Sequence, residues 1–204
     1  MFSTHIRHRT VTVLSVAALT IGAATVSIGD AHAAPALAPR FQLAATALKP
    51  AIRLSQSGVI MFPMNPLPKC SLSKTSFGQP RPNGRTHEGI DLMASLGQEV
   101  YAVDNGVLTR QAVDGATNAT LSGNAWTLTM PDKTYYFYGH LSKFADGLAV
   151  GSAVIRGQLI GYVGDTGDPG PGNYHLHFEV HPKGGVAVDP YPLLTIPKSC
   201  TVVA

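Results

Sequence analysis

The sequence predicts a single, mainly β domain built from antiparallel sheets. Only 13% of the residues are charged and 45% are hydrophobic, a balance that excludes a charge-rich disordered protein. From residue 58 onward, short β-rich runs alternate with Gly, Pro, Asn and Asp, and no stretch keeps a helical apolar period. The 204 residues leave room for one ordinary domain and a tail. These observations predict an all-β sandwich or a barrel-like domain.

The N-terminal segment has the organisation of an export signal. A short basic head is followed by an uncharged, apolar stretch over residues 10–28 and by the small-x-small triplet A-H-A at 31–33. We therefore expect residues 1–33 to be a signal peptide cleaved before Ala34, and the mature protein to be secreted or extracytoplasmic without membrane contact. A retained membrane anchor is the alternative, because the uncharged stretch is nearly long enough to span a bilayer.

The mature chain divides into an arm and a domain. Residues 34–57 are rich in Ala and Pro and are expected to form a linker or a loosely docked arm. The domain is expected to cover residues 58–204. Its predicted strands are 59–62, 90–93, 99–103, 107–112, 125–130, 134–139, 159–163 and 175–181.

Charge and cysteine content limit the possible partners. A net charge of +3 without a run of Lys or Arg argues against nucleic-acid binding. We also expect the protein to be a monomer. In an exported protein, Cys70 and Cys200 are expected to form an intramolecular disulfide. Closing so long a loop would stabilise the fold by about 4–5 kcal/mol in the chain-entropy model. A role as metal ligands is disfavoured, because neither cysteine has another ligand type beside it.

The first candidate site is the motif H-E-G-I-D, which contains His87 and Asp91. Gly89 and the Asn-Gly pair at 83–84 favour a loop entering a strand over a helix. His87 can then reach back from the loop while Asp91 projects from the strand. An imidazole and a carboxylate are both good ligands for a borderline cation such as zinc.

The second candidate site is the strand H-L-H-F-E-V-H over residues 175–181. Because side chains alternate along a strand, Leu, Phe and Val are expected to face the core from one side. The other side carries His175, His177, Glu179 and His181. The neighbouring imidazoles of His175 and His177 are therefore expected to point together into the space that this face of the sheet lines.

His140 ends an aromatic-rich strand in the motif Y-G-H-L. A lone histidine there is more often structural. However, three of the eight histidines lie in the leader, and four of the remaining five fall in H-E-G-I-D, in Y-G-H-L and in the H-L-H that begins the strand at 175.

The ordered motifs resemble the LytM/lysostaphin-type zinc metallopeptidases of the M23 peptidase family. That family shows H-x-x-x-D, then a lone His, then H-x-H. Further similarities are the runs at 76–78, 100–107 and 157–164, and the resemblance covers residues 58–192. It implies a β domain with a groove flanked by loops, and an endopeptidase that cuts stem-peptide cross-links or glycine-rich bridges of bacterial peptidoglycan.

The resemblance also implies residue roles. It implies His87, Asp91 and His177 as ligands of one Zn²⁺ per chain, and His140 and His175 as catalytic histidines that do not bind the metal. Three protein ligands would leave a fourth position for a water activated by zinc. No acid or base is assigned between the two catalytic histidines.

Several neighbouring residues carry weaker expectations. Glu88 is expected at the surface, and His181 is expected to be exposed and unliganded. Glu179 could orient the His177 imidazole, or it could form an ordinary ion pair or face solvent. Tyr136 and Tyr138 alternate in step with His140, so their hydroxyls could border the groove, although packing in the core or at its rim is the better interpretation.

Two other functions remain open. A non-catalytic wall-binding or regulatory domain could have the same fold, but here all five site positions carry the expected residue. A biotinyl- or lipoyl-like carrier would need a lysine at a tight hairpin tip, and Lys133 lacks the methionine-flanked setting of biotin sites.

Overall fold

The computed structural model describes residues 60–116 and 121–204. The expected signal peptide at 1–33 and the arm at 34–57 therefore lie outside the described residues. Within the described part, no helix is long and apolar enough to cross a membrane.

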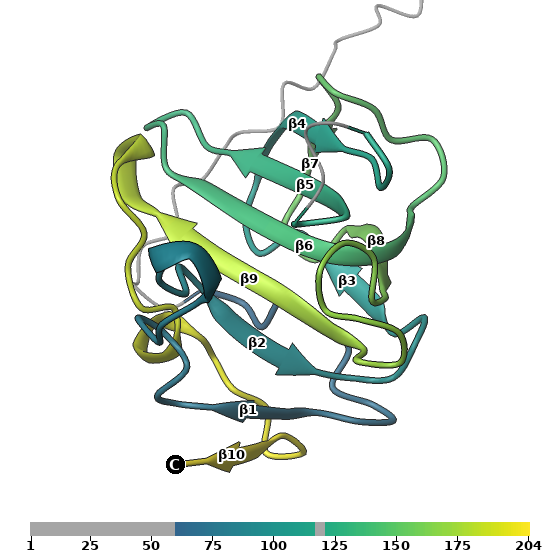
Figure 1. The fold of residues 1–204 in the computed structure, drawn as a ribbon. Coiled ribbons are helices and arrows are strands. Elements are labelled where there is room, and N and C mark those ends of the chain that lie inside the picture. Colours follow the sequence, from purple (N-terminus) through teal and green to yellow (C-terminus); the bar gives the residue numbers. More distant parts are fainter. Residues whose placement is uncertain (1–59, 117–120) are drawn as a thin grey trace, which may run out of the picture. The chain divides into compact units, whose positions relative to one another are not determined.

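The described residues form one mostly antiparallel sheet of ten strands (Figure 1). The main path runs β10-β1-β2-β9-β6-β5-β4-β7, and β8 joins β3 to β6. Only the pairing of β1 with β10 is parallel among the named strands of the described residues. The strands are β1 (Ser71–Ser73), β2 (Ile90–Met93), β3 (Glu99–Tyr101), β4 (Gly106–Ala112), β5 (Asn124–Thr129), β6 (Tyr135–Phe144), β7 (Ala153–Val154), β8 (Leu159–Val163), β9 (His175–His181) and β10 (Thr201–Val203). Three single-turn 3-10 helices complete the described elements: η1 (Pro82–Gly84), η2 (Pro182–Gly184) and η3 (Tyr191–Leu193). The predicted mainly β, antiparallel fold is confirmed.

Most predicted strands are present, and one prediction is wrong. The strands at 90–93, 159–163 and 175–181 have the predicted bounds. The expected strand at 59–62 is reduced, in its described part, to a single bridge between Ile60 and Leu194. Pro63 follows directly and has no backbone N–H to continue a ladder, which explains why no strand extends there.

The core forms on the apolar side of β9, as the alternation predicted. Leu176 and Phe178 are fully buried, together with Tyr138 of β6 and Trp126 of β5. The two polar rings satisfy their hydrogen bonds inside: the indole of Trp126 donates to the Ile160 carbonyl, and the Tyr138 hydroxyl accepts from the Val103 amide. Buried Tyr and Trp usually need such partners.

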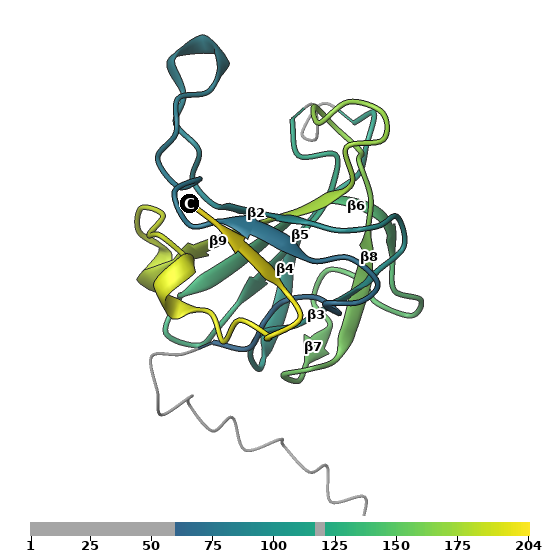
Figure 2. The ribbon, with the colours of Figure 1, turned by 90° about the horizontal axis from the view of Figure 1, so that it is seen from below.

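Two loops rise from the opposite side of the sheet (Figure 2). One connects β1 to β2 over residues 74–89 and carries η1, and the other connects β8 to β9 over residues 164–174. A cleft of about 570 Å³ is lined by residues from both loops and from β2, β6 and β9. This arrangement is the expected groove flanked by loops.

The expected disulfide joins Cys70, just before β1, to Cys200, just before β10, across a sequence separation of 130 residues. β10 pairs with β1 in the same region. The disulfide therefore attaches the C-terminal strand to the edge of the sheet.

Candidate metal centre

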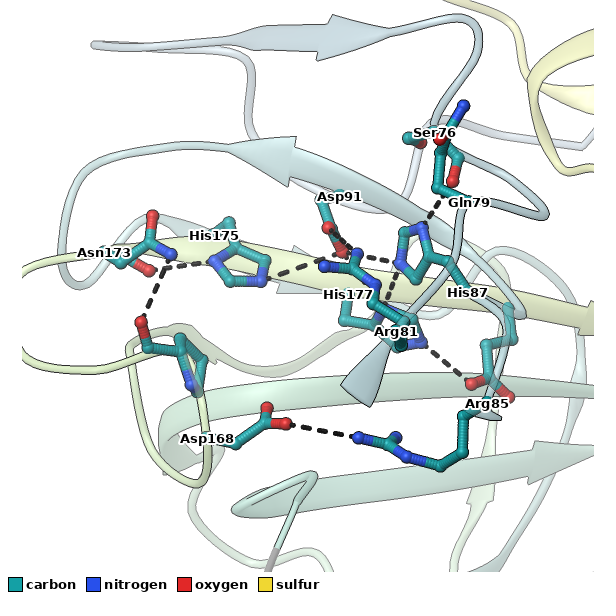
Figure 3. Close-up of polar contacts among 12 residues, drawn as sticks. Ser76, Gln79, Arg81, Arg85, His87, Asp91, Asp168, Asn173, His175 and His177 are labelled. Carbon is teal, nitrogen blue, oxygen red and sulfur yellow. Dashed lines mark hydrogen bonds and ion pairs between the residues drawn. The ribbon is translucent and has the colours of Figure 1, made fainter. Parts of the chain in front are cut away.

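Three of the predicted site residues meet at one point of the cleft (Figure 3). Asp91 of β2 lies directly opposite His177 of β9 in the strand register, and His87 reaches in from the end of the 74–89 loop. His87 Nε2 lies 2.9 Å from His177 Nδ1 and 3.0 Å from Asp91 Oδ1. His177 Nδ1 lies 3.0 Å from the same Asp91 oxygen. These three residues form a group that could hold a metal ion.

The outer nitrogen of each imidazole has its own partner. His87 Nδ1 lies 2.8 Å from the Ser76 carbonyl oxygen, and His177 Nε2 lies 2.8 Å from Glu179 Oε1. Each outer nitrogen can donate its proton there, which leaves a lone pair on the inner nitrogen of a neutral ring. Two lone pairs and a carboxylate oxygen then face one another, an arrangement that a cation stabilises.

The pKa shifts of Asp91 and His177 also indicate that this group of residues attracts positive charge. Burial alone would raise the pKa of Asp91, but hydrogen bonds from His177 and His87 outweigh burial and hold it well below its usual range. Burial would lower the pKa of His177, but its contacts with Asp91 and Glu179 raise it to about 9. The pocket therefore favours positive charge beside these carboxylates.

The donor set fits zinc. Two imidazole nitrogens and a carboxylate oxygen are ligand types that zinc binds. On a tetrahedral ion with bonds of about 2.0–2.1 Å, ligand atoms lie about 3.3 Å from one another. The observed separations of 2.9–3.0 Å are close to this spacing.

Gly89 was interpreted from the sequence only as a sign of a loop, but in the structure it also has a packing role. A Cβ at this position would lie 2.4 Å from the Phe178 carbonyl oxygen and 2.9 Å from Cε1 of the His177 ring. Because such contacts cannot be accommodated without a shift, only glycine lets the H-E-G-I-D segment lie against β9.

The structure places His140 and His175 beside this group. Their ring centroids are 4.8 Å apart, and the His140 ring lies 5.8 Å from the His177 ring. His140 Nδ1 is 2.9 Å from the Thr166 carbonyl oxygen, and His175 Nδ1 is 2.8 Å from the Asn173 carbonyl oxygen. Both rings can donate from Nδ1, which leaves Nε2 for another partner. Burial, with His175 and His177 nearby, lowers the pKa of His140 to about 4, so this ring is neutral at neutral pH.

The expectation that Tyr136 and Tyr138 share a face with His140 is wrong. Both tyrosines are buried in the core, which agrees with the preferred expectation that they pack there and do not border the groove. In β6 it is Gly139 that lies opposite His177, so strict alternation would turn His140 toward the core. His140 instead has a left-handed backbone, with φ of 61°, and the β5–β6 register shifts around it, between the pairs Trp126–Tyr138 and Asn124–Leu141. This irregularity returns the His140 side chain to the cleft.

The expectation that His181 is exposed is also wrong, because its side chain is only 6% exposed. Its Nε2 lies 2.8 Å from Glu179 Oε2, its Nδ1 lies 3.0 Å from the Gly185 carbonyl oxygen, and its ring stacks on Tyr135. The turn formed by η2 folds back over the strand end and covers the ring. Glu179 therefore joins two imidazoles, consistent with the orienting role considered for it. Glu88 is exposed, as expected.

Sequence reasoning missed two arginines that line the cleft, Arg81 and Arg85. An Arg81 nitrogen lies 2.8 Å from Asp91 Oδ2, the oxygen that points away from His177, and Arg85 lies 3.8 Å from Asp168 (Figure 3). The available signal was a pair of arginines flanking the Asn-Gly turn ahead of H-E-G-I-D.

Comparison with known proteins finds similar peptidases. The profile of peptidase family M23 matches residues 85–190. An L-Ala--D-Glu endopeptidase of Bacillus subtilis (strain 168) is 32% identical over 133 residues, which cover 59% of this chain and 39% of the relative. The glycyl-glycine endopeptidase ALE-1 of Staphylococcus capitis is 36% identical over 117 residues, which cover 55% of this chain and 30% of that relative. The chain thus spans well under half the length of these two relatives.

A solved structure shares the fold. A zinc-containing peptidase from Vibrio cholerae superposes with a TM-score of 0.50 at 26% identity, covering 62% of this chain and 37% of the other. The profile match covers more than half of the sequence and contains all five candidate site residues. The chain belongs to peptidase family M23.

Proposed function

We propose that this protein is an exported zinc metalloendopeptidase that hydrolyses peptide bonds in bacterial peptidoglycan. The observation that carries the proposal is the convergence of His87 Nε2, Asp91 Oδ1 and His177 Nδ1 on one point of an open cleft. Two relatives in the same family are named endopeptidases, one for an L-Ala--D-Glu bond and one for glycyl-glycine. The Cys70–Cys200 disulfide supports export, because disulfides persist in oxidising compartments.

In the proposed mechanism, His87, Asp91 and His177 would hold a zinc ion, three protein ligands being the number typical of catalytic zinc sites. A zinc ion bound there would activate a water molecule and polarise the scissile carbonyl. Arg81 holds the second oxygen of Asp91, and Glu179 holds the outer nitrogen of His177. These contacts keep the ligand atoms in place without using the inner lone pairs.

His140 and His175 are proposed as the proton-transfer and oxyanion-stabilising groups. Each is fixed through Nδ1 by a backbone carbonyl, and the two rings lie edge to face. The low pKa of His140 keeps that ring neutral, with a lone pair on Nε2. A ring at either position that has gained a second proton could donate from Nε2 to the developing negative oxygen.

The proposal is tested by digestion of purified sacculi of several chemotypes, with mass spectrometry of the released fragments. We expect zinc-loaded protein to release fragments with new peptide amino and carboxyl ends and intact glycan linkages. Chelation should stop the release, and added zinc should restore it. Zinc-loaded protein that binds sacculi but releases no peptide fragment would contradict the enzymatic proposal and favour a non-catalytic binding domain.

A further inference from the structure

The two loops that flank the cleft carry charged side chains: Arg81, Arg85 and Glu88 on the 74–89 loop, and Asp168 on the 164–174 loop. The 74–89 loop turns at Asn83 and Gly84, both with left-handed backbone, and the Arg81 amide donates to the Arg85 carbonyl across the turn. This short hairpin places two guanidinium groups at the cleft, with Arg81 on Asp91 and Arg85 facing Asp168. The 164–174 loop presents Asp168 from the other side.

The two arginines differ in what they bind. Arg81 makes a short ion pair with Asp91 and thereby belongs to the metal centre. Arg85 faces Asp168 at 3.8 Å, with side-chain exposures of 42% and 48%. That separation is too long for a hydrogen bond, and an exposed pair at this distance contributes little. Within the described part of the chain, the Arg85 guanidinium makes no side-chain hydrogen bond.

An arginine with unused donors beside the reaction centre is suited to one kind of ligand. Guanidinium presents a planar fork that matches a carboxylate in a two-point, charge-assisted interaction. Asp168 shows that a carboxylate can approach Arg85 from inside the cleft, and the exposure of both groups leaves Arg85 accessible to a substrate carboxylate.

We propose that Arg85 binds a carboxylate of the substrate next to the scissile bond, and that the preferred substrates are acidic stem peptides rather than neutral glycine bridges. This inference rests on the proposed function. The two named relatives illustrate the two chemistries, since an L-Ala--D-Glu bond adjoins an acidic residue and a glycyl-glycine bond does not. Asp168 acts as a competitor that the substrate carboxylate displaces.

The test compares three synthetic peptides: a cross-linked stem-peptide dimer with free carboxylates, the same dimer with every carboxylate amidated, and pentaglycine. The zinc-loaded full-length mature protein is measured as wild type, Arg85→Gln, Arg85→Lys and Asp168→Asn. Arg156→Gln serves as a matched control, because Arg156 is exposed and does not line the cleft. Zinc content is measured for each variant to show that the metal centre is intact.

We expect wild type to favour the free-carboxylate dimer over the amidated dimer by about 10- to 100-fold in kcat/KM, the range of one charge-assisted contact. Arg85→Gln should bring this ratio close to one, mainly through KM, and Arg85→Lys should keep an intermediate ratio. Asp168→Asn should raise the ratio, because the competitor is removed, and Arg156→Gln should retain the wild-type ratio.

Equal kcat/KM for the two dimers in wild type would overturn the inference while leaving the proposed function standing. Faster cleavage of pentaglycine than of the free-carboxylate dimer, or an unchanged ratio in Arg85→Gln, would do the same. Cleavage of none of the three peptides, with intact sacculi also left undigested, would overturn the proposed function and this inference with it.

Discussion

In the candidate metal centre, the two proposed histidine ligands are positioned by hydrogen bonds from the ring nitrogens that face away from the ion site. His87 is held by the Ser76 carbonyl, and His177 is held by Glu179, which in turn is held by His181. Each of these contacts selects the tautomer whose inner nitrogen can bind a cation. The five site residues were predicted from motif order, but the buried His181 and the two cleft arginines were not, because their roles arise from loops that fold back over the sheet.

Substitution of individual site histidines separates metal binding from catalysis. His140→Ala and His175→Ala should retain one zinc per chain but lose peptidoglycan cleavage by at least about 100-fold, the scale of general acid–base contributions. His177→Ala should lose both. Zinc analysis and sacculus digestion of the same preparations check this expectation, and wild-type cleavage by His175→Ala would contradict the proposed role.

Glu179→Gln should weaken zinc binding by about 10- to 100-fold, because an amide is a poorer partner for the outer nitrogen of His177 than a carboxylate. Competition with a chromogenic chelator measures the affinity. Glu88→Gln is the matched control, because Glu88 is exposed and adjoins His87 in sequence. An affinity equal to wild type in Glu179→Gln would show that the contact does not support the metal ligand.

At the scale of elements, β9 and β6 show what strand alternation can predict. β9 is regular, so its histidines and its apolar residues fall on opposite faces as expected. In β6 the left-handed residue His140 and the register shift against β5 that encloses it reverse the expected face. A β-bulge is specified by contacts with other segments, here the 164–174 loop, and no pattern within the strand predicts it.

Thr166 stabilises this irregular part of β6. Its hydroxyl accepts from the Asn124 backbone N–H at 2.9 Å and donates to the Leu141 carbonyl at 2.8 Å. Its own backbone carbonyl accepts from His140 Nδ1. Thr166→Val removes the hydroxyl and should lower the free energy of unfolding by about 1–3 kcal/mol. It should also lower kcat, since the residue whose carbonyl accepts from His140 is then less firmly held against β5 and β6.

Thr166→Ser keeps the hydroxyl and serves as the control for this experiment. Urea denaturation and sacculus digestion are measured for both variants. We expect Thr166→Ser to stay close to wild type in both measurements. If Thr166→Val were as stable and as active as wild type, the hydroxyl would not hold the bulge.

At the scale of the whole molecule, the disulfide attaches the short terminal strand β10 to the sheet edge at β1. Neither three-residue strand was predicted, because so short a run carries too few side chains for an alternation pattern. The pairing of the cysteines was predicted from export and from their number, and it is confirmed. The disulfide lies outside the set of residues that line the cleft.

Replacing both cysteines with serine should therefore separate stability from activity. Loss of a cross-link across 130 residues should lower the free energy of unfolding by about 4–5 kcal/mol in the chain-entropy model. The folded double variant should still bind zinc and cleave at a rate near that of wild type below its melting transition. A double variant with unchanged stability would contradict the first expectation, and a folded one that has lost zinc would contradict the second.

The central claim is that His87, Asp91 and His177 together hold one zinc ion. X-ray absorption at the zinc edge of the purified mature protein, combined with metal analysis, tests it most directly. We predict one zinc per chain, surrounded by nitrogen and oxygen atoms at about 2.0–2.1 Å with scattering from two imidazoles. Sulfur neighbours at about 2.3 Å, or a protein that takes up no zinc when the ion is supplied, would contradict the claim.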